Sequence, residues 1–136
     1  MSLTPEDLHG AWALDEWYVE NEDGSRSAPF GRDARGAIMY TTDGYISATI
    51  GSAERFLPAD NPDEAQKAEA YSSYFNYVGT WTIDGDSVTH TIEHALDPNL
   101  VGAAMTRAVE HKGASMAFTG MMADGKTKNV IIWKRR

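Results

Sequence analysis

Two histidines and one arginine are the side chains of this sequence whose types and spacing best suit chemistry. His90 and His94 lie in the segment 87–95, and Arg107 lies in the segment 103–110. Both segments alternate apolar and polar residues, a pattern typical of strands. The face that carries the two histidines also carries, in this segment and the one before it, the apolar residues Trp81, Ile83, Val88 and Ile92. We expect this more apolar face, with its histidines, to point into the protein.

Arg107 shares its expected face with apolar residues of its own segment and the next one: Met105, Val109, Met116 and Phe118. Burial of an unpaired guanidinium is strongly unfavourable. Arg107 is therefore paired with a carboxylate such as Glu16, hydrated, or turned toward a ligand. In the last case it would hold a carboxylate, phenolate or enolate. Beside His90 it would place a fixed positive charge next to a proton carrier, as enolate stabilisation requires.

The two histidines do not have the spacing of a metal site on a strand. Residues four apart share a face but lie about 13 Å from each other, so His90 and His94 cannot bind one ion together, and we expect no metal. A core histidine with satisfied hydrogen bonds is the alternative to a ligand-contacting or proton-transferring one, and His90 suits the latter because it lies deeper in its strand. We also expect no cofactor: the glycine-rich run 31–36 precedes a strand, whereas a phosphate loop precedes a helix.

Composition restricts the class of protein. The 136 residues carry a formal charge of −8, with 12 basic and 20 acidic residues, which argues against a nucleic-acid partner. There is no cysteine, which excludes disulfides and thiolate metal sites and is compatible with a cytoplasmic location. No apolar run is long enough for a membrane helix, and the start does not resemble a secretory signal, so we expect no membrane association. We expect one domain over residues 1–136.

The elements that must position these side chains are short strands separated by turns. A short helix is expected at Thr4-Pro5 and a second one from Ala65 to about Tyr74. The expected strands are 11–20, 36–40, 45–50, 78–83, 87–95, 103–110, 114–121 and 129–134. Strands at this spacing indicate an all-β sandwich or a closed antiparallel β-barrel.

For the hairpin around Asp43-Gly44, the sequence does not decide which of two sets of residues faces inward. One set is Ile38, Tyr40, Tyr45 and Ser47, and the other is Met39, Ile46, Ala48 and Ile50. Tyr71 and Phe75 are expected on one face of the second helix, as core residues.

Several short motifs occur in an order that resembles a known family. They are Leu8-His9-Gly10-Ala11-Trp12, Gly36-Ala37-Ile38-Met39-Tyr40 with Thr41-Thr42-Asp43-Gly44-Tyr45, Tyr77-Val78-Gly79-Thr80-Trp81, Val88-Thr89-His90, Pro98-Asn99, Gly102, Arg107 and Trp133-Lys134-Arg135. Together they resemble the bacterial and fungal lipocalin-like domain family over nearly the whole chain. The resemblance implies a lipocalin-like barrel of about eight strands with a helix packed on it. It also implies that Trp12 closes one barrel end beneath a basic residue, Arg135 or Lys134.

Three functions are considered for this sequence, and the first is a binding module. It would hold a small apolar or amphiphilic molecule in an apolar cavity with a polar, anion-accepting spot, as a monomer or homodimer. The expected ligand-binding residues are His90, His94, Arg107, Tyr40, Trp81 and Phe118. The alternative is a cofactor-independent isomerase, cyclase or hydrolase of small-metabolite metabolism, with His90 and Arg107 as catalytic residues in the same cavity. Haem carriage is a third interpretation and would need an axial histidine in a wide barrel.

Overall fold

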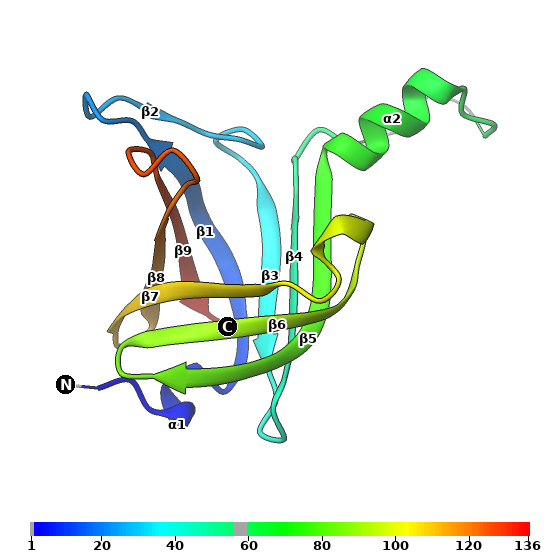
Figure 1. The fold of residues 1–136 in the computed structure, drawn as a ribbon. Helices are drawn as coiled ribbons and strands as arrows, with labels where there is room; N and C mark the ends of the chain where they lie inside the picture. The colour runs from blue at the N-terminus through cyan, green and yellow to red at the C-terminus, as the bar shows by residue number, and fades with distance from the viewer. Residues whose placement is uncertain (1, 56–59) are drawn as a thin grey trace.

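The computed structural model describes residues 2–55 and 60–136, and in these residues the chain forms a closed antiparallel β-barrel (Figure 1). Each strand of the barrel pairs with the next along the chain, and the first pairs with the last. The barrel strands are β1 (Gly10–Glu20), β3 (Arg35–Tyr40), β4 (Tyr45–Gly51), β5 (Tyr74–Asp84), β6 (Ser87–Ala95), β7 (Ala104–Lys112), β8 (Ser115–Met121) and β9 (Lys128–Arg135). A further short strand, β2 (Arg26–Ser27), pairs with the end of β1. The barrel predicted from the sequence is confirmed.

The helices lie outside the barrel wall. Helix α1 (Pro5–Leu8) precedes β1, helix α2 (Glu64–Ser72) precedes β5, and the 3-10 turn η1 (Pro98–Leu100) joins β6 to β7. Helix α2 projects from the barrel end opposite α1 (Figure 1), and none of its residues is buried. It contacts the barrel at β5, and it ends before Phe75, which was expected on the helix but belongs to β5. None of the described helices is long and apolar enough to cross a bilayer.

The inner face of the hairpin formed by β3 and β4 matches neither of the two expected sets of residues. Tyr40 pairs with Ile46, and the amide of Thr41 donates to the carbonyl of Tyr45 across the turn. The inner face therefore combines one expected set from β3 with the other from β4: Ile38, Tyr40, Ile46, Ala48 and Ile50. The turn reaches this register because Gly44 adopts a φ of 100°, a conformation that favours glycine.

One end of the barrel is sealed by Trp12 and the terminal segments. Trp12 is fully buried, and its indole N–H donates to the carbonyl of Leu8 at 3.0 Å. The guanidinium carbon of Arg135 lies 4.1 Å from the centre of the Trp12 ring, and its N–H groups donate to the carbonyls of His9 and Asp7. The basic residue over Trp12 is thus Arg135, the first of the two candidates.

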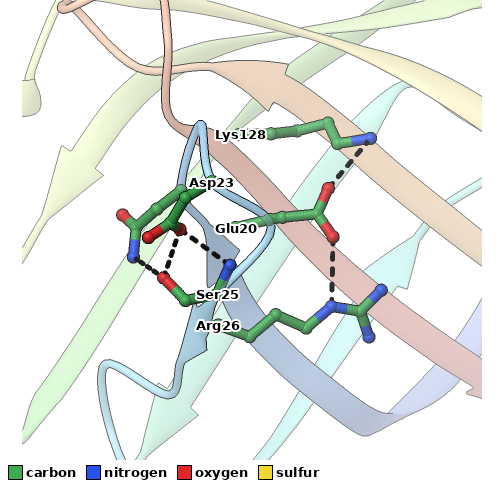
Figure 2. Close-up of polar contacts among 6 residues, drawn as sticks. Glu20, Asp23, Ser25, Arg26 and Lys128 are labelled. Carbon is green, nitrogen blue, oxygen red and sulfur yellow. Dashed lines mark hydrogen bonds and ion pairs between the residues drawn. The ribbon is translucent and has the colours of Figure 1, made fainter.

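The opposite end carries a charged turn between β1 and β2. Figure 2 shows Glu20 between two cations, with Arg26 at 3.1 Å and Lys128 at 3.7 Å. These pairs connect β1 to both β2 and β9. Within the turn, Asp23 accepts hydrogen bonds from the amide and hydroxyl of Ser25, and these bonds lower the pKa of Asp23. The turn at this end is thus held by its own polar side chains.

Two β-bulges change which side chains face inward. On β1, Leu14 pairs with Trp133 and Glu16 with Ile132, so Asp15 is an extra residue. On β6, Ile92 pairs with Gly79 and His94 with Val78, so Glu93 is an extra residue. Because alternation reverses across an extra residue, each bulge exchanges the inner and outer faces beyond it.

Candidate ligand-binding site

A cavity of about 480 Å³ opens inside the barrel. Its walls are mainly aromatic and apolar and include Ile38, Phe75, Tyr77, Met105, Phe118 and Trp133. Its mouth is at the end away from Trp12, where α2 contributes Tyr71, η1 contributes Leu100, and the end of β8 with the turn after it contributes Met121 and Met122. Of these, Tyr71 and the two methionines are exposed. Apart from the hydroxyl groups of its tyrosines, the polar side chains in the lining are those of His90, Asp97, Arg107 and Asn129.

The structure brings three of the six expected ligand-binding residues to the cavity wall: His90, Arg107 and Phe118. Tyr40 is fully buried behind the wall, in contact with His90. Trp81 is displaced toward the sealed end, where its ring packs edge-on against His9 and Tyr40. Neither Tyr40 nor Trp81 lines the cavity, so both pack behind the residues that do.

His94 is exposed and does not line the cavity. The expectation that it shares the inner face with His90 is wrong, because the extra residue Glu93 lies between them. The bulge reverses the alternation beyond Ile92 and turns His94 to the outside. Within the described residues, no three His, Asp or Glu side chains gather as metal ligands.

His90 is held between two tyrosine hydroxyl groups. Its Nε2 lies 2.6 Å from the hydroxyl of Tyr40, and its Nδ1 lies 2.7 Å from that of Tyr77. The imidazole is almost completely buried. Burial, with a smaller effect of the positive charge of Arg107, lowers the pKa of His90 from 6.5 to about 4. His90 is therefore neutral near pH 7.

We expect acidification to destabilise the protein through His90. Its pKa is about 4 in the folded state against 6.5 as reference, so the unfolded chain binds a proton that the folded protein excludes. Above about pH 6.5 both states are neutral at His90, and the free energy of unfolding has its full value. As the pH falls toward about 4, this free energy decreases by about 3 kcal/mol. Urea unfolding between about pH 7 and pH 4.5 measures this loss. Titration of the His90 ring near pH 6.5 by NMR would contradict the prediction.

Arg107 is the cation of the cavity wall. It donates to the carbonyl of Thr106 at 2.9 Å, and its side chain lies against Gly120, where a Cβ would come within 3.0 Å of its Cδ. In residues 2–55 and 60–136, no carboxylate lies within ion-pair distance of Arg107. The expected partner Glu16 is exposed. Asp97 lines the same cavity, but its carboxylate accepts from the amide of Asn99.

Several aromatic residues of the wall are missing from the expected ligand-binding set, among them Trp17 and Tyr77. Trp17 faces inward because the bulge at Asp15 reverses β1, and its indole N–H donates to the side chain of Asn129 at 2.7 Å. The sequence carries no signal for that bulge. Tyr77 does have a signal, since it lies four residues before Trp81, and strict alternation would have placed it on the inner face of an earlier-starting strand.

Comparisons with solved structures find matches at low sequence identity. A de novo designed fluorescence-activating β-barrel aligns over 100% of both chains, with 11% identity and a TM-score of 0.49. The wild-type fluorescent protein UnaG aligns over 98% of this chain and 100% of its own, with 12% identity and a TM-score of 0.46. The N-lobe of lactoferrin binding protein B of Moraxella bovis aligns over 94% of this chain and 60% of its own, with 14% identity and a TM-score of 0.45.

A search of curated proteins finds no match to this sequence. A family model described as a lipocalin-like domain matches residues 9–136. This match begins just before β1 and includes every strand of the barrel. The resemblance noted in the sequence is therefore confirmed, and the chain belongs to the lipocalin-like domain family.

Proposed function

We propose that this barrel binds a small apolar molecule that carries one anionic end, with the anion beside Arg107. The observation that supports this proposal is a guanidinium in a mainly apolar cavity, without a carboxylate partner in the described residues. A guanidinium in such a setting gains from an anion that replaces its water.

The size and lining of the cavity support a compact, mostly apolar ligand. A volume of about 480 Å³ lies within the range of small-molecule sites. The aromatic walls and the apolar mouth favour burial of a hydrocarbon body. The chain as a whole is acidic and does not attract anions over long distances, so the selection of an anion would be local to Arg107.

We favour binding over catalysis because His90 offers no free ring nitrogen to a substrate. Both nitrogens are occupied by tyrosine hydroxyls, and its low pKa makes it a weak base. An isomerase, cyclase or hydrolase in the same cavity stays a prediction that needs another proton carrier. The cytoplasmic location and the monomeric or homodimeric state also stay predictions.

A matched pair of fluorescent probes tests the proposal. The probes are 8-anilino-1-naphthalenesulfonate, which is anionic, and N-phenyl-1-naphthylamine, which lacks the sulfonate. We expect Arg107→Met to weaken binding of the anionic probe by about tenfold or more, since charge-assisted hydrogen bonds are lost, and to leave the neutral probe within about twofold. Fluorescence titration measures both affinities.

Lys67→Met is the control, because it removes the same charge from the exposed surface of α2. It should leave both affinities unchanged. Anionic-probe binding that survives Arg107→Met would contradict the proposed function.

A further inference from the structure

The hydrogen bonds of His90 determine which tyrosine hydroxyl is free to donate. A neutral imidazole has one N–H donor and one acceptor nitrogen. Two tyrosine hydroxyls contact the two nitrogens of His90. One tyrosine must therefore donate its O–H to the ring, while the other accepts the ring N–H and keeps its own O–H available.

The surroundings of the two tyrosines differ. Tyr40 is 2% exposed, lies behind the cavity wall, and has His90 as its hydroxyl's partner among the described residues. Tyr77 is also buried, but it lines the cavity. If Tyr40 accepted from Nε2–H, its own O–H would be buried without an acceptor, which is unfavourable by about 1–3 kcal/mol.

The favoured arrangement avoids that buried, unpaired hydroxyl. In it, Tyr40 donates to an unprotonated Nε2, and the Nδ1–H of His90 donates to the oxygen of Tyr77. The O–H of Tyr77 has no further protein acceptor among the described residues, and the cavity is where water or a ligand can accept it.

We propose that Tyr77 is a ligand-binding residue, whose O–H donates to an acceptor oxygen of the ligand beside Arg107. This inference rests on the proposed function and specifies the ligand's polar end. Arg107 and Tyr77 both offer donors, so the matching group is a carboxylate, which has two neighbouring acceptor oxygens and no donor of its own.

Two further observations agree with a wall that supplies donors. Burial raises the pKa of Tyr77 to about 12, with a smaller opposite effect of the Arg107 charge, so Tyr77 keeps its proton near pH 7 and lies within reach of the charge of Arg107. Trp133 lines the same cavity, and its indole Nε1 is buried without a hydrogen-bond partner. His90 acts through Tyr77, as a positioning residue.

The first test is the tautomer of His90 in the ligand-free protein. Long-range ¹⁵N–¹H NMR of the ring distinguishes a proton on Nδ1 from a proton on Nε2, and the His90→Asn spectrum assigns the signals. We expect the proton on Nδ1. A proton on Nε2 would overturn the proposal, because Tyr77 would then donate to His90.

The second test uses cis-parinaric acid and its methyl ester as fluorescent probes. We expect Tyr77→Phe to weaken the acid by about tenfold and the ester by about two- to tenfold, because the ester keeps its carbonyl acceptor. Arg107→Met should weaken only the acid. Tyr45→Phe removes a hydroxyl from an exposed residue outside the cavity and should change neither affinity.

The two variants separate the two proposals. An unchanged acid affinity in Tyr77→Phe, together with a loss in Arg107→Met, would overturn the role of Tyr77 and leave the proposed function standing. A loss in Tyr77→Phe without one in Arg107→Met would overturn the anion site at Arg107, and with it the paired recognition proposed here.

Discussion

Replacement of Trp12 by alanine is expected to lower the free energy of unfolding by about 3–5 kcal/mol. Trp12 is fully buried at the sealed end of the barrel, so its removal leaves a cavity among residues held by backbone pairing. The variant also loses the hydrogen bond to the carbonyl of Leu8 and the ring beneath Arg135. Because domains of this size are only marginally stable, the loss is a large fraction of the total.

Urea unfolding of Trp12→Ala, Trp12→Phe and Arg135→Met measures the separate contributions at this end. Trp12→Phe keeps an aromatic ring below the guanidinium and should cost less than Trp12→Ala. Arg135→Met removes the cation and its bonds to His9 and Asp7, and we expect a loss of about 1–2 kcal/mol. A change below about 1 kcal/mol in Trp12→Ala would show that this end is not a closed core.

Gly79→Ala is expected to destabilise the barrel by about 3 kcal/mol or more. A Cβ at Gly79 would overlap the carbonyl oxygen of Thr91 and lie 2.8 Å from its carbonyl carbon. Both atoms belong to the backbone of β6 beside the bulge at Glu93, so no side-chain rotation relieves the overlap. The two strands would have to separate where Gly79 packs against Thr91.

Gly51→Ala is the matched control for Gly79→Ala. Its Cβ would first meet side-chain atoms of Tyr74 and Arg55, at 3.1 and 3.3 Å, and these side chains can move. We expect its free energy of unfolding, measured in urea, to stay within about 1 kcal/mol of that of the parent protein. Equal effects of the two substitutions would indicate that Gly79 is not closely packed against β6.

The sequence predicts the barrel well because strand spacing and turn residues depend on local chemistry. Alternation also places His90, Arg107 and Phe118 correctly on the wall. It fails for His94 and Glu16, and in both cases a bulge intervenes. The position of a bulge depends on how the strand pairs with another strand, so no pattern within the segment itself predicts it.

Other parts of the site depend on contacts between strands. The pairing of Tyr40 and Tyr77 across one histidine joins three strands of the barrel, and no spacing in the sequence encodes it. Tyr77 was missed because the second helix was expected to run to about Tyr74, where β5 in fact begins. The meeting of Tyr71 from α2 and Leu100 from η1 at the mouth likewise depends on tertiary structure.

The pairing of β1 with β9 has a consequence for how the chain folds. These strands lie at opposite ends of the sequence, with Trp12 paired to Arg135, whereas each other barrel pair joins strands that are consecutive barrel strands along the chain. Bringing such distant segments together from an unfolded chain costs roughly 4 kcal/mol in loop-closure entropy. We therefore expect hairpins to form first and the β1–β9 seam to close last, in the rate-limiting step.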